Sequence, residues 1–202
     1  MQKQIAVTGG IGSGKSTVLS LLKEKGYSVY SCDEISKSLF FETEYVKEIE
    51  KAFPSVVIDN KIERAKLREL VFSDALARER LNAITHPIIM KRLFSRMRQD
   101  SSLIVFAEVP LLFEGGFENK FCETIIVKRN IQDRIKAICT RDKIGEEDAL
   151  KKIRAQFDYD NESNDKWFDS IGAHVIRNDG DIKLLQLQID KVLQDINMKH
   201  FS

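Results

Sequence analysis

Five short segments of the chain are rich in Val, Ile, Tyr and Phe, and they lie at residues 5–8, 27–31, 103–109, 123–127 and 174–176. The longer ones lack a regular alternation of apolar and polar residues, which is typical of strands that are covered on both faces. Stretches with helical periodicity separate them, so the order is strand, helix, strand, several helices, and then three more strands with helices between them. This alternation predicts an α/β fold with a mostly parallel, five-stranded sheet and right-handed crossovers.

Two insertions and a C-terminal helix complete the predicted elements. Roughly seventy residues separate the second and third strands, too many for one crossover, and residues 35–53 and 66–97 within them have helical apolar spacing. We expect the His86-Pro87 step to interrupt these helices. A charged second insertion covers residues 130–167, where Gly145 and the three acidic residues after it predict the end of one helix and the start of another. Residues 181–196 predict an amphipathic helix with an apolar side formed by Leu184, Leu187, Ile189 and Leu193.

The composition is that of a globular protein that is expected to act in the cytoplasm. The 202 residues are 43% hydrophobic and 31% charged, and 32 basic residues balance 31 acidic ones, which gives no indication of a nucleic-acid or membrane partner. No apolar run reaches the roughly 18 residues that a membrane span needs, and the first residues are unlike a secretory signal. Three scattered cysteines without a CxxC pair are typical of reduced thiols. We expect a monomer or a weak homo-oligomer.

The strongest motif is GGIGSGKS at residues 9–16, which fits GxxxxGK[ST] and has a predicted strand before it and a predicted helix after it. Its glycines allow successive backbone N–H groups to point at phosphate oxygens, and the helix adds its positive end. Lys15 can bridge the β- and γ-phosphates, Ser16 can offer its hydroxyl to Mg²⁺, and Thr17 can reach the α-phosphate. We therefore predict a P-loop three-layer fold that binds ATP and Mg²⁺, with the nucleotide held by Gly10, Ile11, Gly12, Ser13, Gly14, Lys15, Ser16 and Thr17.

Three alternatives to a kinase loop are less consistent with the rest of the chain. A glycine turn with an exposed lysine would not require the strand and the helix that flank it. A GTPase would normally carry an NKxD element, which is absent, and the DxxG string at residues 142–145 lies in a charged helical stretch. The short chain also disfavours a motor-type ATPase. The motif therefore favours a kinase for small molecules, with a core at residues 1–35, 100–130 and 170–202, an acceptor lobe at 36–99 and a lid at 131–169.

A kinase that phosphorylates an alcohol needs a carboxylate to orient the hydroxyl and to accept its proton. Ligands bind at the carboxyl edge of a parallel sheet, so Asp33 after the second strand is the candidate base, and Glu108 at the end of the third strand is a candidate water-mediated ligand of Mg²⁺. The alternatives are a helix N-cap for Asp33 and a hydrogen bond to the phosphate loop for Glu108. Arg134 and Arg141 lie seven residues apart and would share one helix face, either as a lid over the triphosphate or as exposed helix charges.

Taken together, the motifs resemble the dephospho-coenzyme A kinase family over essentially the whole chain. The resemblance rests on TGGIGSGKSTV at residues 8–18, Asp33 in SCDEI, Arg64-x-x-Leu67 with Val71-Phe72, ITHPI at residues 84–88, VPLLFE at residues 109–114, Arg141-Asp142, Arg154-Ala155-Gln156 and Asn178-Asp179-Gly180. It implies a kinase that transfers the γ-phosphate of ATP to the ribose 3′-hydroxyl of dephospho-CoA, the last step of coenzyme A biosynthesis. The alternatives are another small-molecule kinase, for a nucleoside monophosphate or a sugar acid, and a nucleotide-binding regulatory module.

The resemblance also implies roles for particular residues. Asp33 would be the base that faces the 3′-hydroxyl, Arg141 would lie in the lid over the phosphates of ATP, and Asn178 would lie by the adenine. The acceptor site would be lined by His86, Pro87, Leu111, Leu112 and Glu114. The chain departs from the family pattern at Ser31, where an Asp is usual, and at Glu108, where Asp is common.

Overall fold

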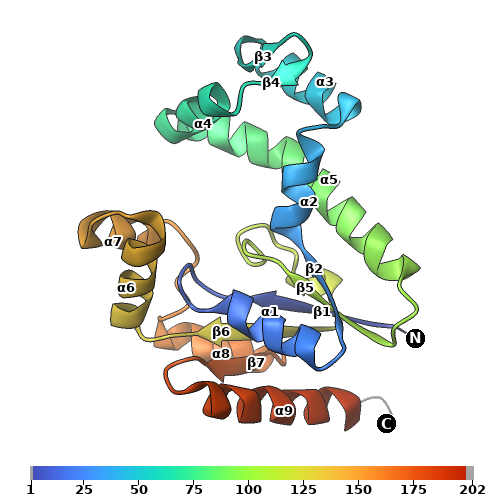
Figure 1. The fold of residues 1–202 in the computed structure, drawn as a ribbon, viewed down its shortest axis with the longest axis vertical. Coiled ribbons are helices and arrows are strands. Elements are labelled where there is room, and N and C mark those ends of the chain that lie inside the picture. Colours follow the sequence, from blue (N-terminus) through green and yellow to red (C-terminus); the bar gives the residue numbers. More distant parts are fainter. Residues whose placement is uncertain (1, 199–202) are drawn as a thin grey trace. The chain divides into compact units, whose positions relative to one another are not determined.

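The computed structural model describes residues 2–198, and the chain divides into two compact units (Figure 1). The larger unit comprises Met1–Val29 and Asp100–Ser202, and the smaller one comprises Tyr30–Gln99. The larger unit contains β1 (Lys3–Thr8), α1 (Lys15–Glu24), β5 (Ile104–Glu108), the short η2 (Glu118–Lys120), β6 (Glu123–Lys128), α6 (Ile131–Asp142), α7 (Glu146–Arg154), α8 (Glu162–Ser170), β7 (His174–Arg177) and α9 (Ile182–Met198). Over residues 2–198, no helix is both long and apolar enough to cross a membrane.

The predicted sheet is confirmed within the described residues, where five strands lie in the order β2-β5-β1-β6-β7. The strand β2 (Ser28–Ser31) lies at one edge, and β1 is central and pairs in parallel with both β5 and β6. In this register Val7 lies opposite Glu108 on one side and Ile125 on the other. The loop that follows β1 therefore leaves the middle of the sheet at its carboxyl edge, which is where ligands bind in open α/β sheets.

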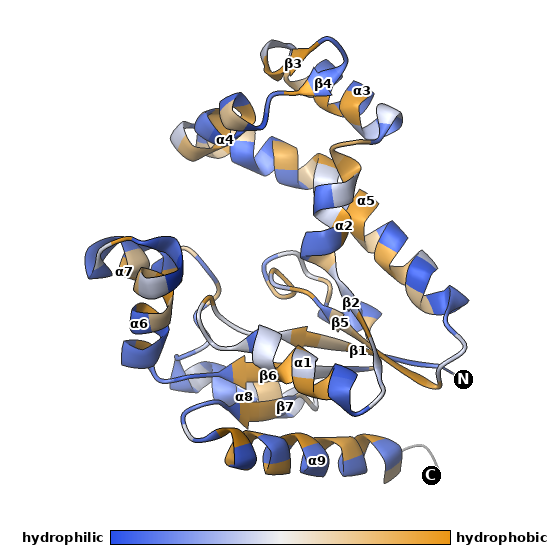
Figure 2. Ribbon diagram, viewed as in Figure 1, coloured by the Kyte–Doolittle hydropathy of each residue, from blue (hydrophilic) through white to orange (hydrophobic). Residues whose placement is uncertain are grey.

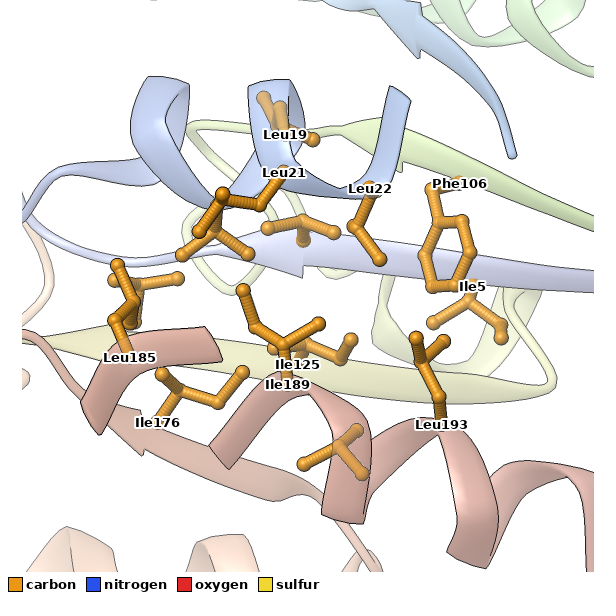
Figure 3. Close-up of a cluster of buried hydrophobic side chains, with 14 of the residues drawn as sticks. Ile5, Leu19, Leu21, Leu22, Phe106, Ile125, Ile176, Leu185, Ile189 and Leu193 are labelled. Carbon is orange, nitrogen blue, oxygen red and sulfur yellow. The ribbon is translucent and has the colours of Figure 1, made fainter. Parts of the chain in front are cut away.

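One hydrophobic core joins α1 and α9 to a face of this sheet, and Figure 3 shows side chains from both helices meeting those of the strands. The buried face of α9 carries Leu185, Ile189, Val192, Leu193 and Ile196 at helical spacing. Full burial of one such side chain contributes about 1.5–3 kcal/mol, so this face holds the helix on the sheet. The prediction that Leu184 and Leu187 lie on the apolar side was wrong, because they are 52% and 67% exposed.

The opposite face of the sheet is covered by α8 and the segment before it, which gives the larger unit its three layers. Ile126 points to this side and packs with an aromatic cluster that consists of Phe113, Phe157, Tyr159, Trp167 and Phe168. Figure 2 shows orange, hydrophobic stretches in the ribbons of β6 and β7, which lie between the two helical layers. Strands covered on both faces need apolar residues on both, which explains why they show no alternation in the sequence.

The helices α6 and α7 follow β6 and have a small core of their own. The Asn130 side chain accepts a hydrogen bond from the Gln132 N–H at 2.9 Å, and this caps the first turn of α6. The predicted break at Gly145 is confirmed, since α6 ends at Asp142 and α7 begins at Glu146 with Gly145 as its N-cap residue. Ile135, Ile138 and Ala149 are buried between the two helices, which holds them together as a hairpin.

The smaller unit is mainly helical, as predicted, but its helices are shorter than the sequence pattern suggested. It contains α2 (Cys32–Leu39), α3 (Thr43–Ala52), the short η1 (Pro54–Val56), β3 (Val57–Ile58), β4 (Lys61–Ile62), α4 (Arg64–Ser73) and α5 (Ala75–Gln99). A break separates α4 from α5 because the Asp74 carboxylate accepts from the N–H groups of Leu76 and Ala77, at 2.8 and 3.2 Å. The sequence pattern missed the β3–β4 hairpin, whose turn residues Asp59 and Asn60 both have positive φ.

The prediction that His86-Pro87 interrupts the helices was wrong. The helix α5 runs without a break from Ala75 to Gln99 and contains Pro87 in its interior. A proline there removes one backbone hydrogen bond and costs about 3 kcal/mol. Four buried residues that follow it on α5 offset this cost by packing into the unit, namely Ile89, Met90, Leu93 and Met97.

Candidate active site

The backbone between β1 and α1 forms a glycine-rich loop with the strand and the helix that the sequence predicted on either side. Gly9, Gly12 and Gly14 have φ angles of 148°, 78° and 89°, which side chains with a Cβ rarely adopt. A Cβ on Gly9 would also lie 2.3 Å from the carbonyl oxygen of Val127, a backbone atom that cannot move aside. Gly14 is the N-cap residue of α1, so the loop ends at a helix N-terminus, where orphan N–H groups attract anions.

Lys15 is folded against the loop that precedes it. Its Nζ donates to the carbonyl oxygens of Gly9 at 2.8 Å and Gly10 at 3.1 Å. These are neutral acceptors, and phosphate oxygens would make stronger, charge-assisted bonds to the same ammonium group. Within residues 2–198, the buried hydroxyl of Ser13 in the same loop has no hydrogen-bond partner. A buried polar atom without a partner is costly and is consistent with a loop shaped around a polar ligand.

Residues 156–160, which connect α7 to α8, hold the loop from outside, and we call them the strap. The Gln156 Oε1 accepts the backbone N–H of Ile11 at 2.6 Å. The Tyr159 hydroxyl lies 2.9 Å from Thr8 Oγ1, and both groups are buried. The strap thus contacts the last residue of β1 and the middle of the loop, and because it directly follows α7 it links the loop to that helix pair.

Arg134 is the second external support of the loop. It is buried, its Nε donates to the Ile11 carbonyl at 3.0 Å, and its Nη1 donates to the Asp160 carboxylate of the strap at 2.5 Å. The sequence had placed Arg134 with Arg141 on one helix, and both do lie on α6. Arg134 is not an exposed helix charge, however. Its guanidinium is paired and desolvated beside the loop, an arrangement for which arginine is well suited.

Arg141 lies near the end of α6 and belongs to an exposed ion-pair network. Its Nε and Nη2 donate to the two carboxylate oxygens of Asp142 at 2.7 and 3.1 Å, and Lys152 from α7 donates to the same carboxylate at 2.6 Å. Hydrogen bonds from Arg141 and Lys152 hold the pKa of Asp142 well below its ordinary value of 3.8. The network joins α6 to α7 and leaves the Arg141 side chain 60% exposed, so that it can reach a ligand.

Other predicted residues of the larger unit lie at the ends of β5 and β7 and in the segment that follows β5. The Asn178 Nδ2 donates to the Ser13 carbonyl at 3.0 Å, which ties the end of β7 to the loop. Glu108 ends β5 and pairs in register with Val7 of the central strand. Leu112 is fully buried, and the Glu114 carboxylate accepts the Phe157 N–H at 2.8 Å. Leu111 is partly buried in the turn between these residues.

The remaining predicted residues belong to the smaller unit. Asp33 is exposed in the first turn of α2, and Ser31, not Asp33, occupies the N-cap position of that helix. His86 is half-buried and Pro87 is exposed on α5. On the same helix, Thr85 Oγ1 lies 2.9 Å from the Tyr45 hydroxyl and so joins α5 to α3. Asp33 is thus the only one of these three residues that offers an exposed ionisable group.

A magnesium ion is compatible with the residues present, provided that a nucleotide supplies most of its ligands. Among the described residues, no group of three or more His, Cys, Asp or Glu side chains could hold a metal by itself. Ser16 is exposed at the start of α1 and offers a hydroxyl oxygen, and Glu108 offers a carboxylate. Mg²⁺ prefers hard oxygen ligands and usually binds through one or two protein groups together with phosphates and waters.

The three residues of the strap that contact the loop or its supports had no assigned role in the sequence analysis. Gln156 belongs to the Arg154-Ala155-Gln156 string, but its position in the sequence gives no sign of a contact with Ile11. Tyr159 and Asp160 lie in a short segment between two helices and have no periodic pattern. Nothing about a glutamine after a charged helix indicates a contact with a distant loop, so only the structure could identify the role of Gln156.

Comparison with known proteins gives one consistent family. The family model for dephospho-CoA kinase matches residues 3–183 of this chain. A dephospho-CoA kinase of Thermus thermophilus is 31% identical over 193 residues, which cover 95% of this chain and 91% of the relative. A crystal structure of TT1252 from Thermus thermophilus has a TM-score of 0.80 at 30% identity and covers 96% of this chain and 97% of its own. A dephospho-CoA kinase structure from Campylobacter jejuni has a TM-score of 0.68 at 26% identity, with coverage of 99% and 100%.

Proposed function

The chain belongs to the dephospho-CoA kinase family, and on that premise we propose which of its own residues transfer the γ-phosphate of ATP to the ribose 3′-hydroxyl of dephospho-CoA. The observation that carries the assignment is the loop in front of α1, where Lys15 is folded against the Gly9 and Gly10 carbonyls beside an open helix N-terminus. A loop of this shape presents backbone N–H groups and one mobile cation to a chain of phosphates.

ATP binds through residues 10–17. When it binds, the Lys15 ammonium exchanges the two carbonyl oxygens for oxygens of the β- and γ-phosphates, because anionic acceptors bind it more strongly. The Gln156 side chain accepts the Ile11 N–H and the Arg134 guanidinium donates to the Ile11 carbonyl, so both backbone groups of Ile11 are held in place before the nucleotide binds. The loop therefore needs little rearrangement when the nucleotide arrives, which lowers the entropic cost of binding.

Asp33 is the general base. Its carboxylate is exposed on the first turn of α2, so it can accept a hydrogen bond from a hydroxyl. As the 3′-oxygen forms its bond to the γ-phosphorus, the bond from that phosphorus to the leaving oxygen of ADP breaks, and Asp33 takes the hydroxyl proton. The products are coenzyme A and ADP.

Arg141 stabilises the charge of the transferring group, and a bound Mg²⁺ would add to this effect. The Arg141 side chain exchanges part of its pairing with Asp142 for phosphate oxygens, while Lys152 keeps the Asp142 carboxylate partnered. Ser16 would hold the metal directly and Glu108 through water, and the ion supplies electrostatic neutralisation of the phosphate oxygens. The scattered thiols support a reduced, cytoplasmic setting.

The decisive test of the base is Asp33→Asn. We expect turnover to fall about 10²-fold or more, because an amide cannot accept the proton, while ATP affinity stays close to that of the wild type. Glu34→Gln removes a neighbouring exposed carboxylate from the same helix turn and is the matched control, which should retain activity. Near-normal turnover by Asp33→Asn would remove Asp33 from this role.

The acceptor is tested separately by an ATP-consumption assay with dephospho-CoA, AMP, CMP and gluconate. We expect strong stimulation by dephospho-CoA alone, since that is the acceptor of the family to which the chain belongs. Stimulation by AMP, CMP or gluconate instead would show a different small-molecule kinase. Slow hydrolysis that does not depend on any acceptor would show a nucleotide-binding module with little catalysis.

A further inference from the structure

The smaller unit contains a depression of about 500 Å³, which we call the lobe pocket. It is formed by the turn between α2 and α3, by α3 itself, by the β3–β4 hairpin and by the first residue of α4. Its ionisable lining residues are all basic, namely Lys47, Lys61 and Arg64, and they lie beside the apolar side chains of Phe40, Val46 and Ile62. Cations combined with apolar walls suit a ligand that is anionic at one point and apolar beyond it.

Aromatic rings hold the arginine of this pocket. The Arg64 guanidinium lies 4.4 Å from the Phe40 ring centroid and 5.3 Å from that of Phe41. Phe41 also lines the pocket and is 84% exposed, so its ring is available to pack against a ligand. These cation–π contacts hold the guanidinium at the pocket, and a guanidinium can recognise a phosphate group through two N–H groups at once.

One face of α2 leads from the proposed base to this pocket. Asp33, Lys37 and Phe40 are spaced by four and three residues and so lie along one side of the helix, whose opposite side buries Cys32, Ile35 and Leu39. Asp33 and Phe40 are seven residues apart, which is roughly 10 Å along the helix axis. In dephospho-CoA, the ribose that carries the 3′-hydroxyl bears a diphosphate on its 5′ carbon, and the pantetheine arm follows the diphosphate.

We propose that the lobe pocket binds the diphosphate of dephospho-CoA and the beginning of its pantetheine arm, with Arg64 and Lys61 on the phosphates. This inference rests on the proposed function, because it places the 3′-hydroxyl at Asp33. The charge of the pocket favours this half of the acceptor. Three cations are electrostatically complementary to a diphosphate, whereas adenine is neutral and would leave their charge uncompensated. The walls formed by Phe40, Val46 and Ile62 then receive the less polar arm.

The test compares the two halves of the acceptor as competitive inhibitors against dephospho-CoA. Adenosine carries the base and the ribose, and 4′-phosphopantetheine carries the arm and one phosphate. For Arg64→Gln and Lys61→Gln, we expect the KM for dephospho-CoA and the inhibition constant of 4′-phosphopantetheine to rise about tenfold, as for loss of a charge-assisted contact. The inhibition constant of adenosine and the KM for ATP should not change.

Two lysines of α3 provide a matched pair of variants. Lys47 and Lys51 each pair with a glutamate three residues earlier, at 3.1 and 2.7 Å, but only Lys47 lines the pocket. Lys47→Gln should raise the KM for dephospho-CoA and Lys51→Gln should not. Urea unfolding of every variant checks that the unit is folded. The proposal is overturned if Arg64→Gln, Lys61→Gln and Lys47→Gln leave the inhibition constant of 4′-phosphopantetheine unchanged. It is also overturned if these variants raise the inhibition constant of adenosine instead.

A calorimetric titration of dephospho-CoA without ATP separates this proposal from the proposed function. If Arg64→Gln binds dephospho-CoA about tenfold more weakly than the wild type does, the pocket is supported, even when the wild-type protein fails to phosphorylate the ligand. In that case the assignment of the reaction fails and the pocket stands. Binding with the same affinity in wild type and Arg64→Gln refutes the pocket whatever the activity of the enzyme.

Discussion

The hydrogen bond between Tyr159 and Thr8 offers the sharpest test of how the phosphate loop is supported. The two hydroxyl oxygens lie 2.9 Å apart, and the residues are 1% and 0% exposed. Tyr159→Phe removes one partner and leaves the other buried without water. A buried polar group that loses its partner costs about 1–3 kcal/mol, so we expect the free energy of unfolding to fall by that amount. Because Thr8 directly precedes the loop, the KM for ATP should also rise.

The companion variant is Thr8→Val, which removes the other hydroxyl with little change of shape. The double variant leaves neither hydroxyl unpaired, so its loss of stability should be about 1 kcal/mol or more below the sum of the two single losses. Urea unfolding measures all four proteins. The only tryptophan, Trp167, reports on the same region, since its ring centroid lies 4.8 Å from that of Phe113 and 5.8 Å from that of Phe157.

Strictly additive losses in this cycle would refute the reasoning, because they would mean that the two hydroxyls do not interact. Tyr27→Phe is the control. Tyr27 is partly buried and packs edge-on against Phe106 in the other core, with a centroid distance of 5.3 Å. Its ring is kept in the phenylalanine variant, so stability should change by much less than for Tyr159→Phe.

Two further predictions concern the strap. Burial raises the pKa of Tyr159 above its ordinary value of 10.0, so the unfolded chain loses this proton at a lower pH than the folded protein does. The stabilisation linked to this proton is therefore present below the unfolded-state pKa of 10.0 and is lost progressively as the pH rises above it. Urea unfolding above that pH should show a smaller loss of stability for Tyr159→Phe than for the wild type. For Gln156→Met, steady-state kinetics should show a KM for ATP raised about three- to tenfold, because the Ile11 N–H loses its acceptor. Gln194→Met on the exposed side of α9 should leave it unchanged, and equal effects of the two substitutions would contradict the role of Gln156.

The strands and the phosphate loop could be predicted from the sequence because their signals are local. Each of the five predicted strands lies within two residues of an observed one, from β1 at Lys3–Thr8 to β7 at His174–Arg177. Runs of β-branched and aromatic residues between glycines carry that information without any knowledge of distant contacts. The break at Gly145 was equally local, since a glycine followed by acidic residues terminates one helix and begins the next.

The predictions that were wrong concern positions where packing decides between local alternatives. Leu184 and Leu187 looked as apolar as Leu185, but the orientation of α9 on the sheet exposes the first two residues and buries the third. Pro87 was expected to interrupt a helix, and the buried residues that follow it keep α5 continuous. The β3–β4 hairpin was missed because its strands have only two residues each, too few for an alternation to show.

The sequence by itself determined that this protein has a parallel α/β core, a loop for phosphates and the motifs of its family. Only the tertiary structure showed what supports that loop, because Gln156 and Tyr159 lie 145 and 151 positions from their partners. It also grouped Lys47, Lys61 and Arg64 around one pocket from three separate elements. A periodic pattern of apolar residues shows which face of a single helix or strand is buried. Contacts between distant elements depend on how the whole chain folds, so they cannot be recognised from the residues next to them in the sequence.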